Sequence, residues 1–128
     1  LSGQVPLMMV GMPSVLGHVK AGKLRALGIT GSKRSQAAPE IPTFSETIPK
    51  FESILWYGLL APAGTPLDVV EKLNEEVLNI LRMHDAKEIF AAQGIEIIGN
   101  SPAEFAGYIK SELAKWAVVV KKSGAKVD

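Results

Sequence analysis

The sequence contains no cysteine among its 128 residues. Disulfide bonds, thiolate metal sites and cysteine nucleophiles are therefore excluded. The absence does not identify a compartment, because a chain without thiols is compatible with oxidising and reducing surroundings alike. Any function of this chain must be carried by other side chains or by the backbone.

Long apolar runs and an excess of one charge are also missing. Hydrophobic residues make up 47% of the chain, but polar residues interrupt them well short of the roughly 18 residues of a membrane span. The 14 Lys and Arg balance the 13 Asp and Glu, which leaves a net charge of +1. This balance gives no excess of positive charge that would indicate binding to nucleic acid or to an anionic membrane. We expect a soluble chain of one ordinary domain's size, long enough to bury a core.

The motifs of catalytic and metal sites are absent as well. The chain has no His-x-x-x-His, Gly-x-Ser-x-Gly or Walker sequence, which zinc, hydrolase and nucleotide sites require. Its two histidines, His18 and His84, are far apart in the sequence and fit surface or capping positions. Three glutamates fall on the polar face of a predicted helix beside basic residues: Glu71, Glu75 and Glu76, with Lys72 and Arg82. We expect no enzyme, no metal and no cofactor.

The start of the chain shows no secretion signal. The first residue is Leu1, and no charged segment followed by an apolar one precedes the predicted fold. We therefore expect a processed chain or a piece of a longer one.

The segment 53–66 is the feature around which the rest is organised. It reads Ser-Ile-Leu-Trp-Tyr-Gly-Leu-Leu-Ala-Pro-Ala-Gly-Thr-Pro. Its first half is a continuous apolar run, typical of a strand covered on both faces. Thr65 as N-cap, Pro66 as first helical residue and Asp68 in the first turn then indicate a helix start. We interpret the segment as a strand that crosses between two lobes.

Residues 1–52 predict a compact βαβ unit followed by a loop. Two short apolar segments, 5–10 and 24–29, are expected to be strands with a right-handed crossover. The short helix between them opens at residues 12–14 and stops at Gly22.

Residues 30–42 predict a solvated loop, because they are rich in Ser, Lys, Arg, Ala and Pro. The basic pair Lys33 and Arg34 is expected to face water. One or two helical turns are predicted over 42–48, ended by Pro49.

Residues 67–128 are mainly helical. The first helix, 67–82, has an apolar stripe at spacings of three and four: Val70, Leu73, Val77, Ile80 and Leu81. A shorter helix is expected from a cap at Asp85 to a stop at Gly94, followed by a small strand over 95–98.

The last predicted helix, 102–121, starts from a capping box of Ser101, Pro102 and Glu104 and ends at Gly124. Its predicted apolar stripe comprises Phe105, Ile109, Leu113, Trp116 and Val120. Two long amphipathic helices thus accompany one short strand. The sequence indicates a coat of helices for a sheet whose other strands are not in this chain.

Two loops fit ligand binding, because α/β sheets bind ligands beyond the carboxyl ends of strands, near free helix amides. One is the loop Val10, Gly11, Met12, Pro13 and Ser14, with a close-approach glycine and a hydroxyl; the other is 61–65. Simple turn chemistry explains both loops equally well. Trp56 and Tyr57 could stack on a ligand, but we expect them to be core residues.

A set of motifs, in order along the chain, resembles the C-terminal part of the Bug-type receptors, the extracytoplasmic solute-binding proteins of tripartite tricarboxylate transporters. The motifs are Gly22-Lys23-Leu24-Arg25-Ala26-Leu27, Pro42-Thr43, residues 56–66, Ala92-Gln93-Gly94, Ser101-Pro102-Ala103-Glu104-Phe105 and residues 123–128. The resemblance covers essentially the whole chain and corresponds to roughly the last two-fifths of a typical member.

The resemblance implies an α/β, periplasmic-binding-protein-like fold, of which the chain is a C-terminal fragment with a crossover strand. In this two-lobed, Venus-flytrap fold, residues 1–52 would end the second lobe, 53–66 would form the crossover and hinge, and 67–128 would belong to the first lobe. It also implies a periplasmic protein that captures a small carboxylate and delivers it to membrane permease subunits.

The loop 10–14 departs from the family pattern. Members commonly carry Asp two positions before Met8 and a polar residue at position 10, whereas this chain has Pro6 and Val10. A less polar pocket wall, or loss of binding, would follow. The alternative function is a truncated form without solute binding that forms homo-oligomers, or exchanges elements between copies, through uncovered helix faces.

Overall fold

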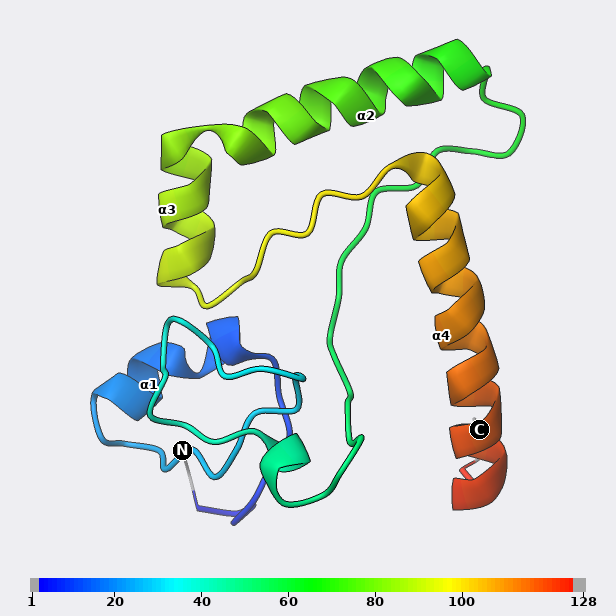
Figure 1. The fold of residues 1–128 in the computed structure, drawn as a ribbon. Coiled ribbons are helices and arrows are strands. Elements are labelled where there is room, and N and C mark those ends of the chain that lie inside the picture. Colours follow the sequence, from blue (N-terminus) through cyan, green and yellow to red (C-terminus); the bar gives the residue numbers. More distant parts are fainter. Residues whose placement is uncertain (1–2, 126–128) are drawn as a thin grey trace. The chain divides into compact units, whose positions relative to one another are not determined.

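The computed structural model describes residues 3–125, which form helices joined by extended and irregular segments (Figure 1). In chain order the helices are η1 (Met12–Ser14), α1 (Leu16–Lys20), η2 (Phe44–Glu46), α2 (Leu67–Arg82), α3 (His84–Ala92) and α4 (Pro102–Ser123), where η marks a 3-10 helix. The helices that the sequence predicts are therefore confirmed, including the short turn after Thr43.

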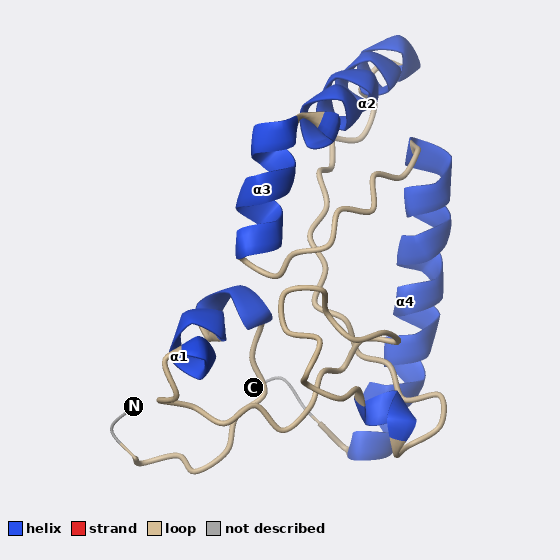
Figure 2. Cartoon of the chain, turned by 60° about the vertical axis from the view of Figure 1, so that its left-hand side comes forward, coloured by secondary structure: helices blue, strands red, loops and turns tan. Residues whose placement is uncertain are grey.

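Residues 3–125 contain no strand, and Figure 2 accordingly draws these connections as loops. The segments expected to be strands were 5–10, 24–29, 53–60 and 95–98. Within the described residues, the only pairing of strand type is an isolated parallel bridge between Ile29 and Thr43. The strand predictions, including the crossover strand, must therefore be corrected for this chain by itself. A strand needs neighbours that bind its backbone groups, whereas a helix binds its own.

The chain divides into two compact units. The first consists of Leu1–Leu60 and Arg82–Ile97, and the second of Ala61–Leu81 and Ile98–Asp128. The predicted lobe boundaries at 52 and 66 concern a whole two-lobed protein, and they stay a prediction.

The first unit has a small core, which we call the Leu16 core. It consists of the buried side chains Leu16, Ala38 and Ile41. Partly buried apolar residues pack around it: Met12, Val19, Ala26, Ile29 and Ala37. Ala38 and Ile41 belong to the loop that the sequence predicted to be solvated, so that prediction is wrong for these two residues. The loop folds over α1 and supplies the apolar cover that the short helix needs.

An ion pair closes this loop. The Arg34 guanidinium donates to Glu46 through both Nε, 2.8 Å from Oε1, and Nη2, 2.7 Å from Oε2. Arg34 also donates to the Pro39 carbonyl at 3.2 Å, and Glu46 Oε1 accepts the Thr43 amide at 3.0 Å. The hydrogen bond from Arg34, and next that from the Thr43 backbone, lower the pKa of Glu46 to about 2. Arg34 is thus tied to η2, and it is also exposed, as expected.

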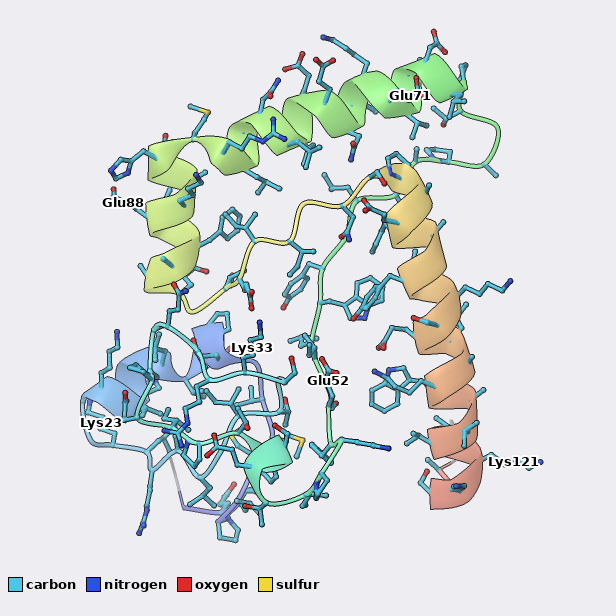
Figure 3. All side chains as sticks on the ribbon, viewed as in Figure 1. Lys23, Lys33, Glu52, Glu71, Glu88 and Lys121 are labelled. Carbon is cyan, nitrogen blue, oxygen red and sulfur yellow. The ribbon has the colours of Figure 1, made fainter. Side chains whose placement is uncertain are left out.

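Three segments of the first unit are held in register around Ile29. The Ile29 amide donates to the Pro42 carbonyl at 2.9 Å, and its carbonyl accepts the Phe44 amide at 2.9 Å. The next carbonyl, that of Thr30, accepts the Ser53 amide at 2.9 Å. Beyond Glu52 the chain continues without helix to residue 66, and its side chains project to both sides (Figure 3).

The second unit contains most of α2 and all of α4, and it buries little apolar surface. Helix α2 has no buried residue, and of the 22 residues of α4 only Glu112 is buried. Two contacts join α2 to the segment before α4: Asn74 Nδ2 donates to the Asn100 carbonyl at 3.0 Å, and Leu78 packs beside Gly99. The described helices include none that is both long enough and apolar enough to cross a membrane.

The predicted start of α4 is confirmed, but its buried stripe differs. The Ser101 hydroxyl accepts the Glu104 amide at 3.3 Å, and Glu104 Oε2 accepts the Ser101 amide at 2.8 Å. The Ser101 hydroxyl also donates to Glu104 Oε2 at 2.6 Å. This hydrogen bond, and next that from the Ser101 amide, lower the pKa of the Glu104 carboxyl. Leu113, expected inside, is 68% exposed, whereas its neighbour Glu112 is buried. The Glu112 carboxylate accepts the Trp116 indole at 3.0 Å and pairs with Lys115, which explains how a charged group occupies the stripe.

The caps expected for α2 and α3 are formed differently. The Thr65 hydroxyl donates back to the Pro62 carbonyl at 2.8 Å, and the first carbonyl of α2 to accept a helical bond is that of Pro66. The N-cap of α3 is Met83 rather than Asp85, whose carboxylate accepts the Ala86 amide at 2.9 Å within the first turn. Both helices still start within two residues of the predicted positions, because an acidic first turn favours a helix N-terminus in either register.

Candidate functional site

The loop 10–14 joins an extended segment to two short helices of the first unit. Val10 ends the extended segment and is exposed, Gly11 and Met12 are half-buried, and Pro13 and Ser14 are exposed. Gly11 is the N-cap of η1, with φ −61° and ψ 136°. The structure thus places the five residues together at one surface turn.

The glycine of this loop has a close neighbour, and its backbone angles are ones that any residue adopts. A β-carbon at Gly11 would lie 2.9 Å from Cδ2 of Leu55. Any larger residue would therefore push against the extended segment after Ser53. The expectation that Gly11 lets a ligand come close to the backbone stays a prediction.

Met12 anchors the loop from the inside. Its side chain packs against the Leu16 core and over Gly94, the second residue after the end of α3. Its carbonyl accepts the Val15 amide at 3.0 Å, which closes η1. The loop is therefore fixed at Gly11 by Leu55 and at Met12 by the core and by Gly94.

Ser14 is the polar end of the loop. Its amide donates to the Gly11 carbonyl at 3.2 Å, so one of the amides expected to be free is used within the turn. Within residues 3–125, the side-chain hydrogen bonds do not use the Ser14 hydroxyl. The loop therefore offers an exposed hydroxyl beside apolar neighbours, an arrangement that can bind one polar group of a small ligand.

The second loop, 61–65, is explained by turn chemistry. Its one hydroxyl, that of Thr65, is bonded to the Pro62 carbonyl, and the Thr65 amide donates to the same carbonyl at 3.2 Å. Gly64 takes φ +86°, which only glycine adopts easily. The polar groups of this loop thus stabilise the turn itself.

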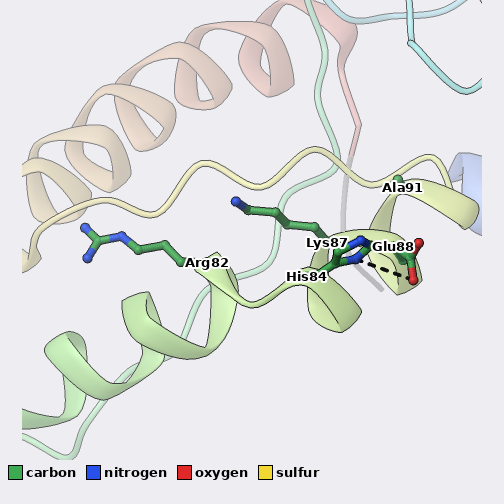
Figure 4. A pocket seen from close by; sticks show the side chains of 5 residues that line it. All are labelled: Arg82, His84, Lys87, Glu88 and Ala91. Carbon is green, nitrogen blue, oxygen red and sulfur yellow. Dashed lines mark ion pairs between the residues drawn. The ribbon is translucent and has the colours of Figure 1, made fainter.

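A shallow surface pocket lies where α2 meets α3, outside the predicted site (Figure 4). It is lined by Arg82, His84, Lys87, Glu88 and Ala91. His84 Nδ1 lies 3.6 Å from Glu88 Oε2, and both side chains are largely exposed. The pocket consists of the flexible ends of surface side chains, so it does not provide a preorganised binding site.

Other predicted candidates are not brought together into a site. His18 is exposed on α1, and the described residues contain no group of three His, Asp or Glu side chains able to hold a metal ion. On α2, Lys72 pairs with Glu76 at 2.8 Å and Glu75 at 3.7 Å, which agrees with the polar face predicted from sequence. Tyr57, expected in the core, is 78% exposed, so that expectation is wrong for the chain by itself.

No signal in the sequence indicates the residues that hold the candidate loop 10–14 from outside. Gly94 was predicted as a helix stop, and its φ of +71° confirms this, but its packing against Met12 carries no sequence signal. Leu55 was predicted only as part of an apolar strand. Both contacts join segments that are distant in the sequence, and spacing rules describe only near neighbours.

Comparison with solved structures identifies the class of protein. The chain is similar to R. palustris Rpa4515 with adipate, with 31% identity and a TM-score of 0.78 over 88% of this chain and 38% of that one. It is similar to a periplasmic transporter with 40% identity and a TM-score of 0.81, covering 91% and 39% of the two chains. The periplasmic binding protein BugD matches at 30% identity, a TM-score of 0.78 and coverage of 88% and 38%. The fold is that of a periplasmic binding protein, and the match fits a C-terminal portion of it.

Sequence comparison then identifies the family. The model of the tripartite tricarboxylate transporter family receptor, TctC, matches residues 1–125, and the chain belongs to this family. Protein BugT of Bordetella pertussis (strain Tohama I) is 38% identical over 128 residues, which are 99% of this chain and 39% of that protein. A protein of Pseudomonas sp. (strain P51), from the tcbD-tcbE intergenic region, is 35% identical over 94% of this chain and 36% of its own length.

These matches confirm the resemblance and the fold class predicted from sequence. The chain spans about two fifths of the length of the relatives that it matches. The family consists of transporter receptors rather than enzymes, and its members are periplasmic binding proteins.

Proposed function

We propose that these residues form part of a periplasmic receptor that captures a small carboxylate and delivers it to the membrane subunits of a tripartite tricarboxylate-type transporter. The observation that carries the proposal is the family match over residues 1–125. A similar protein is described with adipate, which is a linear dicarboxylate, and this supports the carboxylate class.

The loop 10–14 is the part of the site that we assign to this chain. Ser14 would donate its hydroxyl to a carboxylate oxygen, and Val10 and Pro13 would face the aliphatic part of the solute. Met12, whose side chain packs inward, would hold the loop. A charge-assisted hydrogen bond contributes about 1.5–3 kcal/mol, and the apolar wall favours a hydrocarbon chain over a hydroxylated one.

Calorimetric titration tests the proposal on the receptor that contains these residues in its full length. Adipate and a series of mono- and dicarboxylates are the solutes. We expect Ser14→Ala to weaken the binding of the preferred solute about tenfold, which corresponds to the loss of one hydrogen bond to a charged group. Ser32→Ala, an exposed serine in another loop of the same unit, is the control and should bind as the parent does. No binding of any carboxylate by the full-length receptor would overturn the proposal.

A second candidate function is self-association without solute binding. It is favoured by the apolar side chains that α2 and α4 expose, including Leu67, Leu73, Ile80 and Leu113, each more than half exposed. Light scattering of the isolated chain distinguishes the two states. Association should weaken in Leu73→Lys and Ile80→Lys, whereas Lys110→Ala on α4 should not weaken it. A monodisperse monomer of the parent chain would exclude this candidate.

A further inference from the structure

Two helices of the first unit end in the same backbone motif. At the end of α1, the Gly22 amide donates to the Val19 carbonyl at 2.9 Å and the Lys23 amide to the His18 carbonyl at 2.9 Å. At the end of α3, the Gly94 amide donates to the Ala91 carbonyl at 3.0 Å and the Ile95 amide to the Phe90 carbonyl at 2.9 Å. The two glycines have φ +68° and +71°. Both ends are Schellman motifs, and each needs glycine for its backbone.

The two glycines differ in what lies over them. A β-carbon at Gly22 would meet no atom within 4 Å. A β-carbon at Gly94 would overlap the sulfur of Met12, lie 3.1 Å from Met12 Cγ and lie 3.6 Å from Ala37 Cβ. The surface of Gly94 is therefore a seat for the Met12 side chain, and this role is additional to the helix stop.

Met12 transmits this contact to the candidate binding loop. It is the first residue of η1, and its neighbour Gly11 is pressed against Leu55 on the other flank. The loop thus has a neighbour on each flank, Leu55 beside Gly11 and Gly94 beneath Met12. A displaced Met12 would shift η1 and with it the Ser14 hydroxyl.

We propose that Gly94 is a positioning residue for the ligand-binding loop 10–14, acting through Met12, so that the residue closing α3 determines how the loop meets a carboxylate. This inference rests on the function proposed above. It assigns to α3 a role in solute recognition although α3 contributes no side chain to the loop.

Paired glycine variants of the full-length receptor test the inference. Gly94→Ala places a methyl group in the Met12 seat, whereas Gly22→Ala imposes the same backbone strain with open space around it. The first measurement needs no solute: the methyl NMR signal of Met12 should shift in Gly94→Ala and not in Gly22→Ala. The signal of Met83, an exposed methionine, is the internal reference.

The second measurement is titration with adipate. We expect Gly94→Ala to raise the dissociation constant for adipate about fivefold or more relative to Gly22→Ala. This is the size of effect expected when two residues in contact, here Gly94 and Met12, are energetically coupled. Met12→Ala and the double variant Met12→Ala with Gly94→Ala complete a cycle. Once Met12 is shortened, Gly94→Ala should weaken binding no more than Gly22→Ala does, because the seat is empty.

The outcomes separate the inference from the function on which it rests. An unmoved Met12 signal in Gly94→Ala, or adipate affinities of Gly94→Ala and Gly22→Ala within twofold, would overturn the inference and leave the receptor function standing. A parent receptor that binds no carboxylate would overturn the function, and the inference with it. An equal loss from Gly94→Ala in the presence and absence of the Met12 side chain would overturn the coupling through Met12.

Discussion

The Leu16 core and the two long helices contain similar apolar side chains, yet only the core buries them. Leu16 on α1 is 5% exposed, whereas Leu113 on α4 is 68% exposed. The helix α1 has only five residues, but the loop 30–42 returns over it within the same stretch of chain. Helices α2 and α4 form from local signals and have no such cover within their unit. The comparison shows that helix formation and helix burial have separate causes. Formation depends on residues within the helix, whereas burial depends on whether another segment of the same unit packs over the helix.

The largest effect that this contrast predicts is a difference between two identical substitutions. Leu16→Ala should lower the free energy of unfolding by about 2–5 kcal/mol, because it empties a buried position. Leu113→Ala should change it by less than about 0.5 kcal/mol in the isolated chain. Urea titration followed by circular dichroism measures both. Equal effects of the two substitutions would contradict the contrast between a covered and an uncovered helix.

The capping box of α4 should have the next largest effect, because an uncovered helix depends on its own ends. Ser101→Ala removes the hydroxyl that accepts the Glu104 amide and should destabilise α4 by about 1 kcal/mol. Thr65→Ala is the matched change before α2, where the hydroxyl bonds Pro62 rather than a helix amide. The far-ultraviolet signal of the chain should fall more for Ser101→Ala. An equal loss from both variants would show that the box does not stabilise α4.

The ion pair between Arg34 and Glu46, which closes the loop 30–42, predicts that the stability of the chain depends on pH in the acid range. The pKa of Glu46 is lowered to about 2 by Arg34 and the Thr43 amide, against 4.5 as the ordinary value. The stabilisation is therefore complete above about pH 4.5 and is lost as the pH falls toward 2. The parent should lose stability over this range, and Glu46→Gln should lose less. Thermal melting from pH 5 to 2 measures both slopes, and Glu40→Gln, on an exposed carboxylate of the same loop, is the control.

The smallest effect is expected on the polar face of α2. Lys72→Ala removes the exposed ion pairs with Glu75 and Glu76, so it should lower the stability of the helix only slightly. Molar salt should remove most of the difference between variant and parent, because exposed charges are screened. Melting curves at low and high salt measure it. A loss that persists in molar salt would mean that the aliphatic stem of Lys72, rather than its charge, stabilises the helix.

The features that could be predicted from the sequence depend on contacts within one helical turn, and those that could not depend on contacts between distant segments. The starts and ends of α2 and α4 were predictable, because Pro66, Ser101 and Gly124 act within one helical turn. The burial of Ala38 and Ile41 was not, because it depends on Arg34 meeting Glu46 across the loop. Leu113 and Glu112 are neighbours on one helix, and an apolar-spacing rule selects the leucine. It could not anticipate that Trp116 and Lys115 would satisfy a buried carboxylate.

The candidate binding loop shows the same limit at the scale of the site. Gly11 and Ser14 were predicted from the residue types that follow an apolar segment. The contacts beside these residues come from Leu55, which lies at Gly11, and from Gly94, which lies under Met12. No spacing rule connects either residue to the loop. The contacts that support the loop were therefore not readable from the chain, and the prediction that the loop binds a ligand stays a prediction.

The bonds at Ile29 and Thr30 have a consequence for assembly. Ile29 is already bonded to Pro42 and Phe44, and Thr30 to Ser53, although no strand exists in residues 3–125. These bonds fix the relative direction and alignment of three segments, although the segments form no sheet by themselves. A strand supplied by the rest of a receptor would add to an edge whose alignment is preset, so its docking would need no search among sliding registers.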